Sequence, residues 1–553
     1  MPLARLALAS GLGVVLLAAL GGAAAAQVPG EDRFFFVAEE NDEEDETAFD
    51  GSLTSSTFYY REVGGLGTPY GGGNTPAAPE NASPVDRLFT DLRGQLNARH
   101  IRGSKLDARI DLRGRMTASG LDPDGDRVPN EVPFQSGTVY GNELEIRELY
   151  VRRDGSTYDW AVGRQFVLEL AAVRFDGVKI EQERSKRWRL IGFAGTYPTR
   201  GSRDIREDYP VGDNDFDTDG IQPKRIIPVT GGLGAAYRYD RLYGSFGAVV
   251  IAPLANDQAT GTLEKPRLFA TSTGYWRQSM KLDLYHYAVL DAMGAAGAGL
   301  TNLTLGANFQ PVPALRTYAQ ISRIDTETLN VQAQTRLDEP DSNPNALGVI
   351  QNNLEVARIA QESARLGVSA NLMNRFEIST NATLRRRPAL TVETIDGVEV
   401  LFPRSQAVDI TISAVDRKSW KDLRIGVSGT RTIGVGDVNL YRSRSLVLRA
   451  DVSREVLDGE AEVEGNLTYL NSQDDNIGGT CSPIDVETCY GASRVTSYSL
   501  GGLMYYRFKP DWYAIGSASL GRQSLKTTVM QGQIASQSPI TLASFFLRLA
   551  YRF

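Results

Sequence analysis

The sequence has 553 residues, a formal net charge of −8, 42% hydrophobic residues and only two cysteines. The mild acidity predicts no nucleic-acid partner, and beyond residue 26 no apolar run reaches the 18 residues of a transmembrane helix. Length alone would allow three or four domains, but from residue 86 onward short alternating segments follow one another with hardly a helical period among them, which favours a single architecture.

Residues 1–26 have the pattern of a secretory signal peptide. Arg5 supplies the positive charge, an apolar stretch runs from Leu6 to about Leu20, and three alanines precede a plausible cleavage site before Gln27. The alternative is a membrane anchor. The small residues of the distal part and the sharply polar sequence that follows favour an exported protein.

Residues 27–50 form a separate acidic segment that carries the run EENDEEDE at 39–46. We expect a solvated periplasmic segment. The alternative is a tail that folds into a basic pore or binds a periplasmic partner. This segment is too short for a folded plug, which disfavours a plugged, energy-coupled transporter.

The segment from 88 to 116 shows the repeating pattern most clearly. Apolar residues such as Leu92 and Leu112 alternate with charged ones such as Arg93 and Arg113, on both sides of a turn at 102–104. Charge at every second position over successive strands is typical of a transmembrane barrel, whose polar face lines a wet lumen and whose apolar face meets lipid. We therefore expect an all-β, antiparallel transmembrane β-barrel over residues 51–553.

The first strand is expected at about 51–62, and a less regular one at 173–183. Later strands repeat the alternation at 364–372, 376–385 and 461–469, each with roughly the 9–11 residues that a tilted strand needs to cross the hydrocarbon, and over a shorter stretch at 408–413. The count is about 22 strands, with 18 or 20 as alternatives. An open sheet edge in lipid would leave backbone groups unpaired, so the sheet must close.

Short and long connections also alternate along the chain. Tight connections are expected at 152–156, 239–241, 310–314, 373–375, 457–459 and 509–511. Long ones are expected at about 63–85, 118–141, 197–228, 326–357, 388–405, 472–493 and 524–539. This is the outer-membrane arrangement, with tight turns and both chain ends in the periplasm and long loops outside.

Arginines dominate the inward positions. The candidates for lumen-lining selectivity residues are Arg93, Arg99, Arg109, Arg113, Arg115, Arg147, Arg365, Arg385 and Arg387. Charges in a narrow low-dielectric wall set ion selectivity. The alternative, which the sequence leaves open, is that each arginine pairs with a lumen carboxylate and only packs the wall.

Three long loops carry further candidates. Asp122, Asp124, Asp126 and Glu131 surround a glycine turn with the oxygen ligands that Ca²⁺ prefers, although a plain acidic loop is the competing interpretation. The loop at 326–357 has apolar residues at helical spacing and is either a short helix in the lumen or an external lid that leads into the next strand. Cys481 and Cys489 are close in one loop, and in an oxidising compartment they predict a disulfide.

The last nine residues, FFLRLAYRF, alternate to the final position, with Leu549, Tyr551 and Phe553 on the apolar face. This ending resembles the C-terminal signature of bacterial outer-membrane barrels, which in that family is read by the barrel-assembly machinery. The resemblance implies that the last strand closes the barrel against the first, and that these three residues form an assembly signal.

A second resemblance covers about residues 142–196. Gly163-Arg164-Gln165 and Phe175-Asp176-Gly177-Val178 are similar to a G-R-Q and F-D-G-V pattern of porin-like and alginate-exporter-like barrels. It implies passage of a solute or an anionic polymer across the outer membrane of a Gram-negative bacterium, in contact with outer-membrane lipid and lipopolysaccharide.

The expected function is therefore a porin-like channel for polar solutes, with anionic solutes as a candidate class. The alternatives are an export barrel for a secreted polysaccharide and a structural component of an envelope machine. No cofactor is expected apart from the candidate Ca²⁺. The sequence has two histidines and no G-x-S-x-G motif, so no enzymatic activity is expected.

Overall fold

The computed structural model describes residues 47–63, 85–119, 143–198, 228–253, 266–293, 297–325, 360–373, 375–388, 390–393, 399–402, 404–420, 423–435, 441–476, 493–528, 534–536 and 539–553. Several expectations therefore lie outside the described residues. These are the signal peptide, nearly all of the acidic segment, the candidate Ca²⁺ loop at 122–131, the loop at 326–357 and both cysteines.

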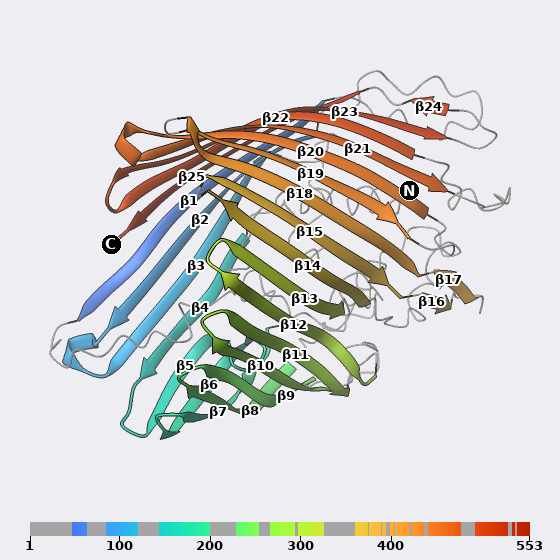
Figure 1. Ribbon diagram of the computed structural model, residues 1–553. Helices are drawn as coiled ribbons and strands as arrows, with labels where there is room; N and C mark the ends of the chain where they lie inside the picture. Colours follow the sequence, from blue (N-terminus) through green and yellow to red (C-terminus); the bar gives the residue numbers. More distant parts are fainter. Residues whose placement is uncertain are drawn as a thin grey trace, which may run out of the picture.

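Twenty-two strands form one closed antiparallel sheet, as the sequence predicted (Figure 1). They are β1 (Ala48–Val63), β2 (Val85–Arg99), β3 (Leu106–Ser119), β4 (Glu143–Arg153), β5 (Tyr158–Val167), β6 (Val173–Ser185), β7 (Trp188–Thr196), β8 (Pro228–Tyr239), β9 (Leu242–Pro253), β10 (Arg267–Ser279), β11 (Leu282–Met293), β12 (Gly299–Val312), β13 (Leu315–Asp325), β14 (Ala360–Leu372), β15 (Phe376–Arg387), β18 (Ser405–Trp420), β19 (Leu423–Gly434), β20 (Tyr441–Val456), β21 (Ala461–Asn476), β22 (Ser493–Lys509), β23 (Trp512–Thr528) and β25 (Ile540–Arg552).

The remaining elements are small. A separate hairpin joins β16 (Leu390–Glu393) to β17 (Glu399–Phe402), and β24 (Ile534–Ser536) adds to β23 alone. Among the residues that the structure describes, the 3-10 turns η1 (Ile101–Gly103) and η3 (Leu457–Gly459) lie between strands. No helix within the described ranges is long and apolar enough to cross a membrane. Within the same ranges no plug domain lies inside the barrel.

The barrel closes between its first and last strands. β25 pairs antiparallel with β1 from Ser52 opposite Arg552 to Val63 opposite Thr541. The expected strand pairing at the C-terminal end is therefore confirmed, and β1 begins at Ala48, three residues before the position expected from the sequence. Closure gives every strand two neighbours, which is the condition for placing backbone N–H and C=O groups in hydrocarbon.

The two faces of the wall follow the alternation in the sequence. The outward face leaves large apolar side chains exposed all around the ring, among them Leu92, Leu233, Leu366, Ile412 and Leu500. The alternate positions point inward and carry the ion pairs and hydroxyl groups described below. A polar inside and an apolar outside identify a transmembrane barrel, since this distribution is the reverse of that in a water-soluble barrel.

The connections fall on two rims. One rim, called here the tight-turn rim, carries the short connections, for example between β4 and β5, β8 and β9, and β22 and β23. The opposite rim, called the loop rim, carries the connections that the sequence predicted to be long. The long connections expected from the sequence are thus confirmed. Four other links on the loop rim are shorter: five residues between β5 and β6, thirteen between β9 and β10, five between β11 and β12, and six between β19 and β20.

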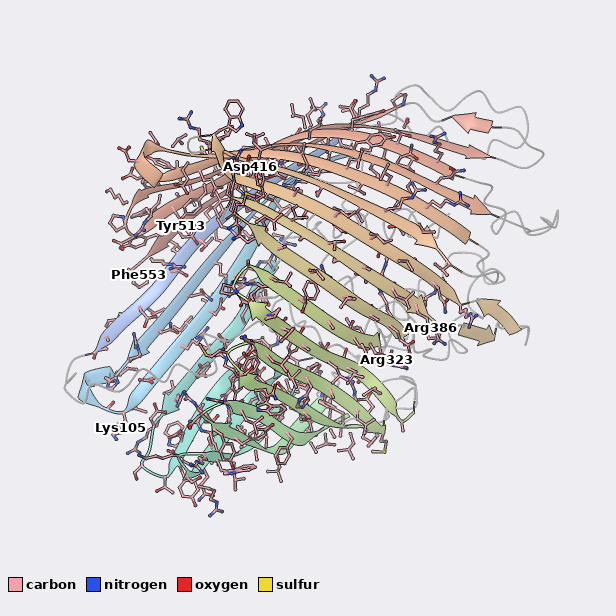
Figure 2. All side chains as sticks on the ribbon, viewed as in Figure 1. Lys105, Arg323, Arg386, Asp416, Tyr513 and Phe553 are labelled. Carbon is pink, nitrogen blue, oxygen red and sulfur yellow. The ribbon has the colours of Figure 1, made fainter. Side chains whose placement is uncertain are left out.

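Aromatic rings line the outward face near the tight-turn rim beside the closure, where Figure 2 labels Phe553. Neighbouring ring centroids lie 4.6–5.9 Å apart in the series Tyr506, Phe508, Trp512, Tyr551 and Phe553. Amphipathic rings of this kind are favoured at the membrane–water interface. The backbone of Phe553 also exchanges two hydrogen bonds with Gly51, at 3.0 and 3.2 Å, so the final residue still belongs to the sheet.

Candidate functional site: the lumen wall

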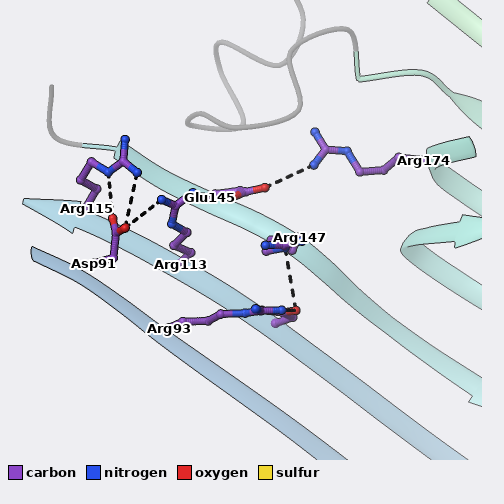
Figure 3. A network of polar contacts seen from close by, with 8 residues as sticks. Asp91, Arg93, Arg113, Arg115, Glu145, Arg147 and Arg174 are labelled. Carbon is purple, nitrogen blue, oxygen red and sulfur yellow. Dashed lines mark hydrogen bonds and ion pairs between the residues drawn. The ribbon is translucent and has the colours of Figure 1, made fainter. Parts of the chain in front are cut away.

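A network of arginines and carboxylates covers the inner face of β2, β3 and β4 (Figure 3). Arg93 donates to Asp111 through Nε and Nη2, at 2.9 and 2.6 Å. Asp91, two residues before Arg93 on the same face of β2, accepts hydrogen bonds from Arg115 at 2.8 Å and from Arg113 at 2.9 Å. Because these side chains share one face of adjacent strands, the alternation within each strand brings them together.

The network continues across β4 to β6. Glu145 lies 3.6 Å from Arg113 and 3.7 Å from Arg174 of β6, and Arg109 lies 2.5 Å from Glu148. A β-bulge near Glu148, where Asp111 pairs with Glu148 but the next residue pairs with Ile146, adds Arg147 to the same face, 4.0 Å from Asp111. A bulge places two consecutive residues opposite one, which re-aims a side chain.

We call these ten residues the arginine network. Its cations are Arg93, Arg109, Arg113, Arg115, Arg147 and Arg174, and its anions are Asp91, Asp111, Glu145 and Glu148. Six cations minus four anions leaves a formal charge of +2. Pairing therefore accounts for most of the charge on this wall, and a positive excess remains.

The other predicted lumen arginines lie apart from this network. Arg99 pairs with Asp50 of β1 at 3.0 Å, and Arg385 pairs with Asp409 of β18 at 2.6 Å. Arg365 stacks over the ring of Tyr318, with its guanidinium carbon 5.3 Å from the ring centroid. Arg387 lies at the loop-rim end of β15, opposite Ser405.

The link between β5 and β6, residues 168–172, folds into the barrel, and we call it the inward turn. Leu170 at its centre is fully buried and packs onto Gly234 of β8 and Gly247 of β9, where a Cβ atom would lie 2.5 Å from Leu170 Cδ2. The Ser245 hydroxyl donates to the Glu169 carbonyl at 2.7 Å, and Lys179 Nζ lies 3.5 Å from the Glu169 carboxylate. The turn is thus fastened by one apolar and two polar contacts.

An apolar cluster lies beneath the inward turn. Its buried members come from the turn and from β5, β6, β7, β9, β10 and β11: Val167, Leu170, Val173, Phe175, Ile191, Phe193, Val249, Phe269 and Val289. These residues can be buried only on the inside of the wall, because outward neighbours such as Leu233 are left 74% exposed. The cluster therefore thickens one side of the barrel by a layer of side chains and narrows the lumen there.

Arg164 and Asp176, which the second sequence resemblance singled out, pair across β5 and β6 close to the inward turn, with the outward parity of Val162 and Val178. The Arg164 guanidinium binds both Asp176 oxygens at 2.6 Å and donates to the Ile146 carbonyl at 3.2 Å. The β4–β5 ladder ends where Leu149 pairs with Arg164, so the guanidinium reaches a carbonyl beyond the end of the ladder. Gly163 (φ 130°) lies opposite Gly177, where a side chain would collide with the β7 backbone.

The wall away from the inward turn is rich in hydroxyl groups. Paired hydroxyls on adjacent strands lie 2.6 Å apart for Ser322 and Ser363, 2.6 Å for Ser379 and Ser413, and 2.9 Å for Thr411 and Thr430. Such pairs satisfy each other and still offer lone pairs to a passing solute. On this side too the hydroxyl pairs lie among ion pairs, such as Arg385 with Asp409 and Arg449 with Glu464, both at 2.6 Å.

The sequence interpretation identified the arginines but not the inward turn. The signal was present: residues 166–175 read FVLELAAVRF, an apolar run in which strict alternation fails. When both odd- and even-numbered positions of a segment are apolar, both of its faces are expected to be buried. The roles of the arginines in selectivity and of Leu549, Tyr551 and Phe553 in assembly stay predictions.

No family model matches the chain, and no curated protein matches it. Among solved structures, Pseudomonas aeruginosa OpdQ overlays with a TM-score of 0.36 and 8% identity, covering 91% of this chain and 98% of that one. Pseudomonas aeruginosa OccD3 (OpdP) gives 0.35 and 10%, covering 92% of each chain. A bacterial polysaccharide outer membrane secretin gives 0.27 and 13%, covering 60% of this chain and 92% of that one. TM-scores this low do not establish a shared fold, so the assignment of a closed barrel depends on the strand pairing described above.

Proposed function

We propose that the protein is a porin-like channel of the Gram-negative outer membrane that passes polar solutes. One observation carries the proposal: a closed ring of 22 strands has exposed apolar side chains outside and ion pairs and hydroxyls inside. A polar interior enclosed by an apolar exterior provides a path for polar molecules that hydrocarbon would exclude.

Anionic solutes are the class that the charged wall supports. The arginine network carries a formal +2, and a wall of low dielectric constant concentrates the field of such charges within the lumen. Because most guanidinium groups are paired, we expect a modest preference for anions and not an anion-only channel. The paired hydroxyl groups of the wall would offer hydrogen bonds to uncharged polar solutes as well.

We assign no catalytic role. His100 lies in the β2–β3 turn, and His286 shares the outward parity of Leu284 and Leu290 on β11. Its Nε2 lies 2.9 Å from the Ser272 hydroxyl, a contact that satisfies two polar groups on a face turned to lipid.

The proposed setting follows from the two rims. The tight-turn rim would face the periplasm and the loop rim the exterior, with lipopolysaccharide and other outer-membrane lipids around the belt. The barrel-assembly machinery would read the final strand, whose aromatic end lies at the tight-turn rim.

Conductance in planar bilayers tests the proposal directly. The purified barrel should give discrete ohmic steps in KCl, and a salt gradient should give a reversal potential on the anion-selective side of zero. A correctly folded barrel that remains electrically silent would overturn the channel assignment and favour a structural envelope component. A cation-selective current would overturn the assignment of the network's charge.

A further inference from the structure

Arginines without carboxylate partners lie on the outward face of this barrel, near the loop rim. Between β19 and β23 the outward positions include Arg431, Arg444, Arg494 and Arg522, all exposed. Within the residues that the structure describes, none of the four has an ion-pair or hydrogen-bond partner. The predicted lumen arginines of β2, β3 and β4 show the opposite behaviour, since each has a carboxylate within 4.0 Å.

Their outward orientation follows from parity. Arg431 lies on the same face of β19 as Val427 and Ile433, whose side chains are 53% and 41% exposed. Arg444 lies on the same face of β20 as Leu448, whose side chain is 46% exposed. The cations are therefore on the lipid side of the wall and not in the channel.

Arg431 and Arg444 are close to each other. Arg431 pairs with Leu446, and Ile433 pairs with Arg444, so the two arginines are diagonal neighbours on adjacent strands. Diagonal positions of an antiparallel pair are roughly 7–8 Å apart, which long side chains span easily. Two guanidinium groups can thus bind one anion together.

An unpaired guanidinium at this depth needs an anion from the surroundings. An arginine on the lipid face costs roughly 2–4 kcal/mol at the membrane midplane and about 0–1 kcal/mol near the interface, so these positions fit the headgroup zone. Guanidinium binds phosphate oxygens in a bidentate fork. The exposed Ile433 and Leu448 beside the two arginines suit acyl chains, which distinguishes a lipid from a free anion.

We propose that Arg431 and Arg444 form a binding site for the phosphate group of an anionic lipid in the outer leaflet, with Arg494 and Arg522 extending the same cationic arc. The proposal rests on the membrane location of the proposed function but not on conductance. Arg323 and Arg386, which also face outward (Figure 2), share Glu362 of β14 as a carboxylate partner at 2.9 and 3.8 Å, so we exclude that pair from the site.

The test is lipid binding by native mass spectrometry of the full-length purified barrel in detergent. The probes are bis-phosphorylated lipid A and its dephosphorylated form. We expect the phosphorylated lipid to bind, and the double variant Arg431→Gln/Arg444→Gln to weaken its binding roughly 30-fold, because each surface arginine contributes on the order of 1 kcal/mol and ~1.4 kcal/mol is a factor of ten.

Arg454→Gln is the matched control. Arg454 is exposed, has the same outward parity on β20 as Arg444 and lies near the tight-turn rim, opposite Leu423. It should leave binding unchanged. The proposal is overturned if the double variant binds like the wild type, if Arg454→Gln weakens binding as much, or if the dephosphorylated lipid binds equally well.

Two further measurements keep the result unambiguous. Heat-modifiable migration on a gel confirms that each variant is a folded barrel. Displacement of the lipid by millimolar inorganic phosphate would show a soluble anion site and contradict the lipid assignment. Bilayer currents of the same samples separate the two proposals, since a silent barrel that binds the phosphorylated lipid would refute only the channel.

Discussion

Replacing Leu170 by Ala should release the inward turn from the barrel wall. Leu170 is fully buried against Gly234 and Gly247, and the substitution removes its contacts and leaves a cavity. Losses of this kind cost about 2–5 kcal/mol at buried leucines. The hydrogen bond from Ser245 to the Glu169 carbonyl remains and contributes roughly 0.5–1.5 kcal/mol, which is too little to compensate.

The expected effect can be measured as local opening. A loss of 2 kcal/mol at the lower limit raises the population of the open turn roughly 30-fold, at ~1.4 kcal/mol per factor of ten. Hydrogen exchange of amides in residues 166–174 should accelerate by at least this factor, while strands far from the turn keep their protection. In bilayers, the steady current of the wild type should become a fluctuation between two levels.

Leu233→Ala is the control for this prediction. This substitution also truncates a leucine to alanine. Leu233 lies on β8 next to Gly234, but on the outward face, where it is 74% exposed. It should change neither the exchange of 166–174 nor the current. If Leu170→Ala has the wild-type exchange rate, the turn is not held by its leucine, and the packing argument is wrong.

Three further predictions concern charge, topology and assembly. Changing the three arginines of β3, which belong to the arginine network, to Ser takes its formal charge from +2 to −1 and should shift the reversal potential toward cations; an unchanged potential would place them away from the narrow part of the path. Cysteine labelling should reach Asp124→Cys from outside intact cells but not Asp458→Cys in the η3 turn, and the reverse result would invert the topology. Deleting Phe553 should reduce outer-membrane levels more than Leu549→Ala, because a signal read by the assembly machinery can fail on one residue, whereas a lost lipid-facing side chain costs only about 1.5–3 kcal/mol; equal levels of the two variants would leave stability as the whole explanation.

The strands, their faces and the closure of the barrel could be read from the sequence, because they depend on local periodicity. A period of two assigns each residue of a strand to one face, so Leu112 and Arg113 are placed on opposite sides without any tertiary information. The alternation of short and long connections predicted a tight-turn rim and a loop rim. The alternation that continues to the last residue predicted that β25 pairs with β1.

The partners of the inward side chains could not be read in this way. Whether Arg113 faces an open lumen or a carboxylate depends on the register between β2, β3 and β4, which places Asp91 and Glu145 beside it. The bulge near Glu148 changes the parity of β4 partway along, and strict alternation cannot locate it.

The inward turn and the unpaired outward arginines were likewise decided by the tertiary structure. Leu170 is buried because residues of β8 and β9, more than 60 positions away in the chain, present glycines to it. Arg431 and Arg444 become neighbours only through the pairing of β19 with β20. The sequence by itself determined which side of the wall each residue faces, since that is a local property of a strand. Only the closed sheet determined what each residue meets there, because contacts between strands depend on register.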